Sequence, residues 1–208
     1  MFISFEGLDG SGKTTQAQLL AETLRSHGKE VLFLREPGGT EISERIREIL
    51  LDKKHLRMTQ MSEILLFSAA RAQLVSEVIR PALERGTIVI SDRYVDSTTA
   101  YQGFGRGLDL ATVRAINAAA TGGLLPHKTL FIDVPIDELI MRREKSGVPL
   151  DRMEIGGREF FERIREGYLT ICKEESKRVV LIDGLEEIDV LQREIWTLLN
   201  RDFAALRT

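Results

Sequence analysis

Short apolar runs rich in β-branched residues recur along the chain and alternate with longer stretches of helical apolar spacing. None of the runs alternates cleanly between apolar and polar positions, which is typical of strands buried on both faces of a parallel sheet. The five runs are residues 2–5, 31–34, 87–90, 129–132 and 179–182. Because helical patterns separate them, they predict an α/β fold with a doubly wound, five-stranded parallel sheet.

One helical stretch is unusual because an arginine lies within its apolar stripe. Residues 63–80 predict a long helix that ends at Pro81, and Phe67 and Arg71 share one face of it. An arginine in such a stripe needs a partner. A nucleobase that stacks on Phe67 and accepts a hydrogen bond from Arg71 would supply one. An ordinary interior ion pair would do so equally well.

Composition narrows the class of protein. The 208 residues are 43% hydrophobic and 29% charged, and they predict one soluble domain over residues 1–208. The net charge of −3 gives no overall attraction to nucleic acid or anionic membranes, and the single cysteine excludes an internal disulfide. No apolar stretch approaches the ~20 residues of a membrane span, and the N-terminal run is too short for a signal peptide. We therefore expect a cytoplasmic protein without a nucleic-acid or membrane partner.

The most specific motif lies directly after the first predicted strand. Residues 7–14 read Gly-Leu-Asp-Gly-Ser-Gly-Lys-Thr and fit the P-loop pattern G-x-x-x-x-G-K-[ST]. Its backbone N–H groups make an anion cradle at a helix N-terminus, Lys13 adds a point charge, and Thr14 suits Mg²⁺. A glycine-rich turn that binds nothing is the alternative, but the complete motif and its flanks disfavour it. The residues expected to hold the triphosphate of ATP are Gly7, Asp9, Gly10, Ser11, Gly12, Lys13, Thr14 and Thr15.

Further charged residues favour a compact kinase among the P-loop proteins. The guanine-reading Asn-Lys-x-Asp of GTPases is absent from the sequence. Arg35 and Arg93 follow predicted strands, and Arg47 lies on the helix after a Gly-Gly turn, so all three suit an anionic second substrate. Asp92 ends a strand at the position of a Walker-B carboxylate and is a candidate Mg²⁺ ligand. A cap or an ion pair with Arg93 is the alternative for Asp92.

Several segments, in order along the chain, resemble bacterial thymidylate kinases. They are Phe-Glu-Gly-x-Asp-Gly-x-Gly-Lys-Thr-Thr-Gln at 5–16, Arg-Glu-Pro-Gly-Gly-Thr at 35–40, Asp-Arg-Tyr at 92–94, the stretch 97–103 and Asp-Arg at 151–152. The resemblance runs from residue 1 to about Tyr168. It implies the P-loop nucleoside monophosphate kinase fold, transfer of the γ-phosphate of ATP to dTMP with Mg²⁺, and a homodimer.

The resemblance also implies roles for individual residues. Arg35, Arg47 and Arg93 would hold the dTMP phosphate, while Phe67 would stack on thymine and Arg71 would reach its O4. Thr98 and Gln102 would contact the base, Tyr101 would lie under the sugar and disfavour a ribose, and Asp9 would meet the 3′-OH or order the arginines. The implied dTMP-binding set is Asp9, Arg35, Pro37, Arg47, Phe67, Arg71, Arg93, Ser97, Thr98, Tyr101 and Gln102.

A basic segment at about 142–158 resembles the lid of this family. One branch of the family carries a phosphate-bridging arginine in the P-loop, directly after the Asp, but here that position is Gly10. The resemblance therefore implies that the lid supplies it, with Arg152 as first choice and Arg143 as second, while Arg142 flanks the adenine. From the residues alone, a solvated helix end followed by a loop explains this segment equally well. Together with the P-loop, the expected catalytic residues are Lys13, Arg93, Arg152 and Asp9.

Two other functions remain open at this point. The chain could be a P-loop kinase that acts on another nucleoside monophosphate or on a small metabolite. It could also be a non-catalytic nucleotide-sensing module on the same fold, although the intact Lys13, Thr14, Asp92 and Arg93 argue against that. A panel of phosphate acceptors with ATP separates all three.

Overall fold

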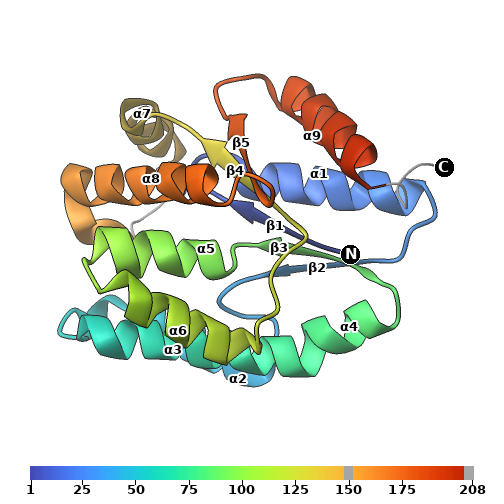
Figure 1. Cartoon of the computed structure of the whole chain (residues 1–208). Helices are drawn as coiled ribbons and strands as arrows, with labels where there is room; N and C mark the ends of the chain where they lie inside the picture. The colour runs from blue at the N-terminus through green and yellow to red at the C-terminus, as the bar shows by residue number, and fades with distance from the viewer. Residues whose placement is uncertain (148–151, 204–208) are drawn as a thin grey trace.

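The computed structural model describes residues 1–147 and 152–203, and within them five strands form one parallel sheet (Figure 1). The strand order is β2-β3-β1-β4-β5, so β1 lies at the centre and the chain winds outwards in both directions. This confirms the predicted α/β class and the doubly wound, five-stranded parallel sheet. The strands are β1 Phe2–Glu6, β2 Val31–Arg35, β3 Ile88–Asp92, β4 Lys128–Asp133 and β5 Val179–Asp183.

Each strand runs one or two residues further than its apolar run. The polar residues at the carboxyl ends belong to the ladder, because Arg35 is in register with Asp92, and Asp92 with Phe5. Backbone pairing continues as long as the neighbouring strand does, whatever the side chain. The charged side chains are therefore attached to rigid strand ends rather than to loops.

Helices cover both faces of the sheet. On one face, aliphatic residues of the strands pack against two helices, α1 and α9, in a single core cluster. On the other face, α3 and α4 cover β3 and the start of β1, while α8 and the segment that carries Tyr101 cover β4. The α-helices are α1 Lys13–Ser26, α2 Glu41–Leu51, α3 Gln60–Leu74, α4 Arg80–Glu84, α5 Val95–Thr98, α6 Leu110–Thr121, α7 Ile136–Ser146, α8 Gly157–Glu174 and α9 Ile188–Asp202.

The prediction that a helix ends at Pro81 is wrong. A π-helical turn, η2 (Val75–Ile79), joins α3 to α4, and Pro81 lies in the first turn of α4. Proline removes an i→i−4 hydrogen bond and its ring clashes with the carbonyl four residues earlier. A wider π turn immediately before the proline changes the bonding pattern where an α-helix would lose that bond, and the chain continues as a helix.

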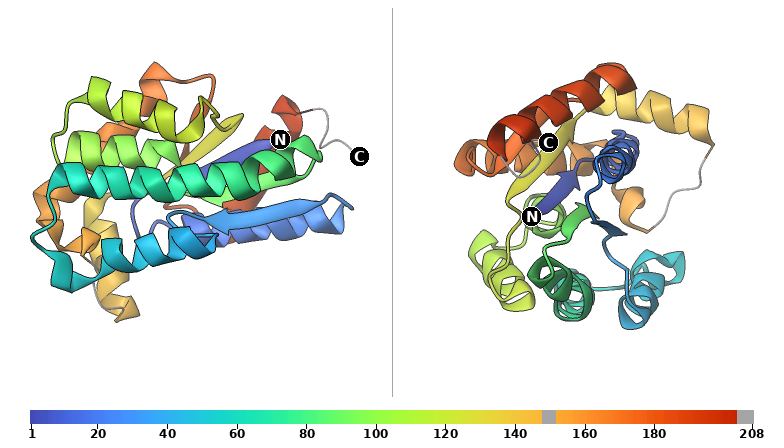
Figure 2. Two further views of the ribbon diagram at one scale, coloured as in Figure 1. Left: turned by 90° about the horizontal axis from the view of Figure 1, so that it is seen from below. Right: turned by 90° about the vertical axis from the view of Figure 1, so that its right-hand side faces the viewer.

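The two ends of the sheet have different surroundings. In the left view of Figure 2, the N-terminus lies at one end of the molecule, and the orange start of α8 lies towards the other. The carboxyl ends of the strands point to that second end, which is where parallel α/β sheets bind ligands. None of the helices in the described part of the chain has the length and apolar character needed to cross a membrane.

Candidate active site

The P-loop connects β1 to α1 through glycines with left-handed backbone. Gly10 and Gly12 have φ of 87° and 90°, and a Cβ at Gly7 would lie 2.7 Å from the carbonyl oxygen of Ile132. These positions therefore require glycine. The N-cap of α1 is Gly12, which has no side chain to cap the first turn. The N–H groups at this helix end are thus available to an anion, as the sequence predicts.

Asp9 connects the P-loop to the strand end of β3. Its Oδ1 accepts hydrogen bonds from Lys13 Nζ and from Arg93 Nη2, both at 2.8 Å. Withdrawal from water opposes ionisation, but Arg93 and Lys13 outweigh it and hold the pKa of Asp9 well below its usual range. Arg93 also donates to the Tyr101 hydroxyl at 3.2 Å and to Ser97 Oγ at 3.1 Å. The geometry brings the predicted catalytic residues Lys13, Asp9 and Arg93 together.

Asp92 and Thr14, the predicted Mg²⁺ ligands, are in direct contact. The Thr14 hydroxyl donates to Asp92 Oδ2 at 2.5 Å. Asp92 Oδ1 is buried and has no hydrogen-bond partner among the residues the structure describes. Within the same residues Arg93 pairs with Asp9 rather than with Asp92. The alternative of an Asp92–Arg93 ion pair is therefore not what this structure contains.

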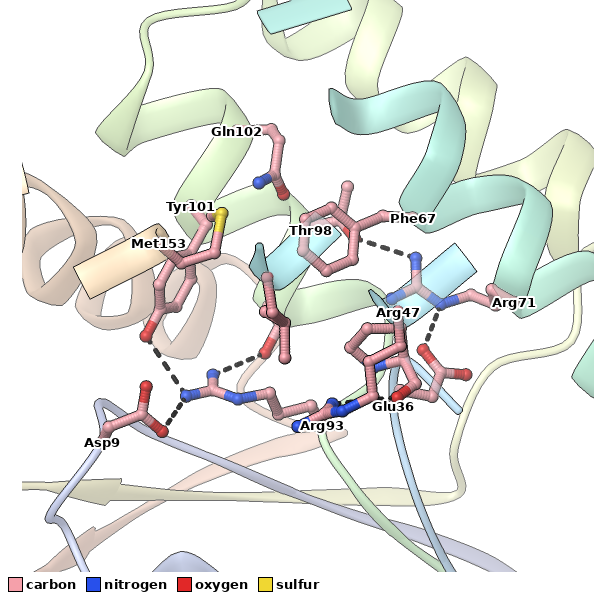
Figure 3. Close-up of a pocket in the computed structure, with 13 residues that line it drawn as sticks. Asp9, Glu36, Arg47, Phe67, Arg71, Arg93, Thr98, Tyr101, Gln102 and Met153 are labelled. Carbon is pink, nitrogen blue, oxygen red and sulfur yellow. Dashed lines mark hydrogen bonds and ion pairs between the residues drawn. The ribbon is translucent and has the colours of Figure 1, made fainter. Parts of the chain in front are cut away.

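A single pocket at the carboxyl edge of the sheet collects every residue of the implied dTMP-binding set except Arg35 (Figure 3). Arg35 instead bonds to Glu44 at 3.2 Å, and its side chain is 48% exposed. Arg47 donates to the Pro37 carbonyl at 2.9 Å and does line the pocket. The lining residues are Asp9, Glu36, Pro37, Arg47, Leu51, Phe67, Arg71, Arg93, Ser97, Thr98, Tyr101, Gln102 and Met153.

Arg71 forms the interior ion pair expected for it, and its contact with a nucleobase stays a prediction. It lines the pocket beside Phe67, and it also forms a buried ion pair in which its Nε lies 2.7 Å from Glu36 Oε2. Its Nη1 donates to Thr98 Oγ1 at 2.9 Å, and its Nη2 donates to the Tyr94 carbonyl at 3.0 Å. Burial raises the pKa of Glu36, and Arg71 opposes that shift. The guanidinium is thus held in one orientation before any ligand binds.

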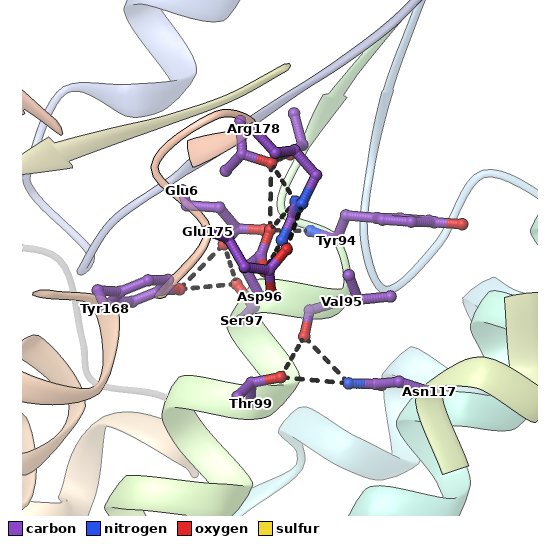
Figure 4. A network of polar contacts seen from close by, with 12 residues as sticks. Glu6, Tyr94, Val95, Asp96, Ser97, Thr99, Asn117, Tyr168, Glu175 and Arg178 are labelled. Carbon is purple, nitrogen blue, oxygen red and sulfur yellow. Dashed lines mark hydrogen bonds and ion pairs between the residues drawn. The ribbon is translucent and has the colours of Figure 1, made fainter. Parts of the chain in front are cut away.

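A second buried carboxylate, Glu6, supports the wall of the pocket from behind (Figure 4). Its oxygens accept from the Tyr94 amide at 2.7 Å, from Ser97 Oγ at 2.5 Å and from the Tyr168 hydroxyl at 3.0 Å. Burial and the nearby charge of Asp96 raise the pKa of Glu6 to about 7, against the effect of the Ser97 hydrogen bond. Because Ser97 also bonds to Arg93, this network fixes the position of a pocket arginine.

A further pocket adjoins the P-loop on the side of β5. Arg142 links the P-loop to the loop after β5. Its Nη1 donates to the Gly10 carbonyl at 3.3 Å, and its Nη2 donates to the Gly184 carbonyl at 3.1 Å. The pocket therefore lies beside the anion cradle, where the predicted adenine-flanking role of Arg142 requires it. Its lining residues are Ser11, Gly12, Thr15, Gln16, Arg142, Gly184, Leu185, Glu186, Glu187, Ile188 and Leu191.

The predicted lid is described in part. Residues 148–151, which include Asp151 of the Asp-Arg motif, lie outside the described residues. Arg152 is buried, and its contacts are Glu63 Oε2 at 2.6 Å and the Leu50 carbonyl at 2.6 Å. Arg143 lies over the ring of Phe161 at 5.7 Å. The structure therefore does not bring Arg152 to the P-loop, and its phosphate-bridging role stays a prediction.

Sequence reasoning missed several residues of this site. Leu51 and Met153 line the pocket, and three buried glutamates, Glu6, Glu36 and Glu63, hold its polar side chains. Two of the glutamates carried a signal, since Glu6 is the first residue after one predicted strand and Glu36 is the second after another. Nothing in the local pattern around Glu63 distinguishes it from a glutamate on a solvated helix turn.

Comparison with known proteins agrees with this geometry. The family model described as thymidylate kinase matches residues 5–195. A thymidylate kinase from Kosmotoga olearia is 48% identical over 94% of this chain and 93% of its own length. One from Caldanaerobacter subterraneus is 50% identical over 90% of this chain and 88% of its own. A crystal structure of thymidylate kinase from Ehrlichia chaffeensis has a TM-score of 0.79 and 36% identity, and it covers 96% of this chain and 98% of that one.

These findings decide between the functions that the sequence left open. The matches extend over nearly the whole chain, so they concern the pocket and the lid as well as the P-loop. They remove the unrelated metabolite kinases and the sensing module from consideration. The chain belongs to the thymidylate kinase family and is a phosphotransferase that uses ATP to phosphorylate dTMP to dTDP.

Proposed function

We propose that the pocket between Asp9 and Gln102 is the dTMP site and that the P-loop delivers the γ-phosphoryl group to it in line. One observation carries this proposal: the implied dTMP-binding residues, Arg35 excepted, come from five separate segments and meet in one pocket beside the P-loop lysine. The attacking phosphate oxygen is already ionised near neutral pH, so no general base is required. Catalysis is then positioning and charge neutralisation by Lys13, Arg93 and a lid arginine.

The dTMP phosphate would be held by Arg93 and Arg47. Asp9, Ser97 and Tyr101 hold the Arg93 guanidinium in place, so little side-chain entropy is lost when the phosphate binds. These contacts favour the second of the two roles expected for Asp9, the ordering of arginines. Arg35 would join the phosphate only after it leaves Glu44.

The thymine would stack on Phe67 and accept a hydrogen bond at O4 from Arg71. A guanidinium has five N–H donors. Within the described residues, hydrogen bonds to Glu36, Thr98, Asn117 and the Tyr94 carbonyl engage four of them. One donor on Nη2 therefore remains for a ligand, in an orientation that the other four fix. Tyr101 would lie under the sugar and disfavour a ribose 2′-OH.

Mg²⁺ would bind at Thr14 and Asp92. The hydroxyl and the carboxylate are hard oxygen ligands, and the buried, unpartnered Asp92 Oδ1 fits a cation or one of its waters. Bound there, the ion would neutralise and orient the phosphates of ATP. Magnesium sites of this kind take one or two protein ligands and complete their shell with water and substrate phosphate, so a larger carboxylate cluster is not needed.

The segment 142–158 would act as the lid. Arg142 would flank the adenine, and Arg152 would bridge the phosphates after leaving Glu63 and the Leu50 carbonyl. Arg143 is the second candidate for the bridging role, because it lies on the same lid at α7. Because the reaction consumes ATP, we place it in the cytoplasm.

A homodimer is supported by exposed apolar residues on two adjacent helices, α2 and α3 (Figure 1). Four of their large apolar side chains are at least 42% exposed, namely Ile42, Ile49, Met61 and Leu65. Val113 of α6 is fully buried within the chain and is not part of such a surface. A molar mass near twice 23.5 kDa by light scattering would support the homodimer, and a mass of one chain would contradict it.

The base-reading assignment is tested by Arg71→Ala. We expect a rise in KM for dTMP and a loss of at least about tenfold in the preference for dTMP over dCMP, because O4 loses its donor. A coupled ADP-release assay over dTMP, dUMP, dCMP, dGMP, AMP and shikimate measures both. Arg45→Ala, at an exposed arginine on α2 whose side chain is 73% exposed, is the matched control. Unchanged selectivity in the Arg71 variant would contradict the assignment.

A further inference from the structure

Glu63 is a buried carboxylate for which the proposed mechanism has no use. It lies in the first turn of α3 and is 2% exposed. Its Oε1 accepts from Gln102 Nε2 at 3.1 Å and from Arg106 Nε at 3.2 Å, and its Oε2 accepts from Arg152 Nη1 at 2.6 Å. A carboxylate is buried in this way only when it is well paired, so the arrangement calls for a reason.

The carboxylate of Glu63 decides which end of the Gln102 amide faces it. Two guanidinium groups, from Arg106 and Arg152, also pair with this carboxylate. An ionised carboxylate accepts hydrogen bonds and donates none. Only the amino end of the Gln102 amide can therefore bond to Glu63, and the amide is fixed against the flip that its nearly symmetric shape would otherwise allow.

The orientation of this amide matters because Gln102 lines the dTMP pocket. Its side chain is directed towards the space between Tyr101 and Phe67 (Figure 3). Because Glu63 holds the amino end, the carbonyl end of the amide is the one left for a ligand. The pocket thus presents a hydrogen-bond acceptor at Gln102 and a donor at Arg71.

This polarity matches one pyrimidine and opposes another. Thymine carries a donor at N3–H and an acceptor at O4, whereas cytosine carries an acceptor at N3 and an amino donor at C4. An acceptor from Gln102 and a donor from Arg71 complement thymine, and both face the wrong partner on cytosine. Uracil has the same edge as thymine, so this pair of groups does not separate dTMP from dUMP.

We propose that Glu63 is a positioning residue that sets the selectivity for dTMP over dCMP by fixing the amide orientation of Gln102. The proposal rests on the proposed function, in which Gln102 contacts the base. It adds a residue that touches no substrate and acts only through another side chain. A merely structural role for Glu63, holding α3 and the lid together through its arginines, would lower activity with every acceptor alike.

The test is Glu63→Gln, assayed as kcat/KM for dTMP, dUMP and dCMP at saturating ATP. The new amide can face Gln102 with either end, so Gln102 is free to flip. We expect the dTMP:dCMP ratio to fall by about tenfold or more, since the rejection of the wrong hydrogen-bond pattern depends on a fixed partner. The dTMP:dUMP ratio is expected to stay as in the wild type, because thymine and uracil share N3–H and O4.

Asp96→Asn is the matched control. Asp96 is also buried, at 3% exposure, and also pairs with an arginine, Arg178 at 2.7 Å, but it does not line the pocket. This variant should leave the dTMP:dCMP ratio unchanged, so that a change in Glu63→Gln reports on the pocket rather than on a weakened core. Glu63→Gln leaves the guanidinium groups of Arg106 and Arg152 without a carboxylate. If this variant does not fold, the double variant E63Q/R106M removes one of the two groups, and the same dTMP:dCMP and dTMP:dUMP ratios test the proposal.

Gln102→Ala separates the two ways in which the proposal can fail. If Gln102→Ala loses selectivity against dCMP while Glu63→Gln keeps it, Gln102 reads the base and Glu63 does not set its orientation. If both variants keep the wild-type ratio, the contact of Gln102 with the base is itself wrong. A parallel loss of activity with all three acceptors in Glu63→Gln would also overturn the proposal, because it would show a structural role alone.

Discussion

The two halves of the site differ in how far their charged groups are already arranged. In the dTMP pocket, Arg71 is held by Glu36, and Arg93 is held by Asp9 and Ser97, each through hydrogen bonds at 3.1 Å or less. On the ATP side, the anion cradle is made of backbone N–H groups, and the arginine expected to bridge the phosphates lies elsewhere, against Glu63. The acceptor side is thus organised before binding, while the proposed role of Arg152 on the donor side would require a rearrangement of the lid.

This difference fits the chemistry of phosphoryl transfer. The protein forms no covalent intermediate in direct transfer. The rate therefore depends on how the substrates are positioned and on charges directed at the transferred group. In the mechanism we propose, a fixed acceptor pocket would supply the positioning, and a lid arginine would supply charge once it reaches the phosphates. An arrangement of this kind also limits the transfer of the phosphoryl group to water.

Arg152→Ala is the variant with the largest expected effect on this difference between the two halves of the site. We expect kcat to fall by about 10³-fold or more, because one arginine on the transferring phosphoryl group has an effect of that size in related enzymes. The KM for dTMP should change little, since Arg152 does not line the dTMP pocket. Steady-state kinetics with both substrates varied measure the two constants. Near-normal turnover would assign the bridging role to Arg143.

A smaller effect is expected from Asp9→Asn on the acceptor side. Asparagine keeps an Oδ1 that can accept from Lys13 and Arg93 but loses the negative charge that attracts both, so both cations are held more weakly than at 2.8 Å from a carboxylate. We expect kcat/KM for dTMP to fall by about 10²-fold, comparable to the loss of one preorganised charge contact. The circular dichroism spectrum and melting curve should show a folded protein. A variant with wild-type kcat/KM would mean that Arg93 does not depend on Asp9 for its position.

Glu6→Gln tests the support behind the pocket through the pH dependence of stability. Because the folded pKa of Glu6 is about 7, above the ordinary value for glutamate, the unfolded chain ionises first as pH rises. Wild-type stability from this group is therefore present at low pH and is lost as pH rises to 7, whereas glutamine does not titrate. Relative to the wild type, the unfolding free energy of the variant should therefore rise between pH 5 and pH 8, by up to about 3 kcal/mol. Urea denaturation at several pH values measures this, and parallel pH profiles for the two proteins would contradict it.

Much of the fold and pocket follows from short-range features of the sequence. Buried parallel strands are recognisable as unbroken apolar runs. Because the strands are parallel, the residues that follow them lie at one edge of the sheet. Phe67 and Arg71 stand out from the apolar stripe of their helix, and Arg47 from its helix after a Gly-Gly turn. The resemblance to a known family adds their roles, and the structure brings all three to one pocket.

The rest depends on contacts between distant parts of the chain. Arg152 lies 89 residues from its partner Glu63, and Glu6 lies 88 residues from the amide it accepts from. No local pattern encodes such pairs, so neither the position of Arg152 nor the role of Glu63 could be anticipated. Arg35 lies outside the pocket because it pairs with Glu44 on the following helix, and the sequence does not show which partner an arginine takes. The helix continues past Pro81 because of the π turn, and the spacing of apolar residues in the sequence does not reveal such a turn.

The bend at the end of β3 has a consequence for how the two substrates are spaced. Three successive residues send their side chains in different directions: Asp92 to Thr14, Arg93 to Asp9, and Tyr94 into the core, where it is fully buried. Arg93 has φ of 72°, a left-handed conformation that a non-glycine residue adopts at a cost. With the cation at Asp92 and the acceptor phosphate at Arg93, as we propose, one stretch of covalent backbone would set the separation between them. Opening and closing of the lid would leave that separation unchanged.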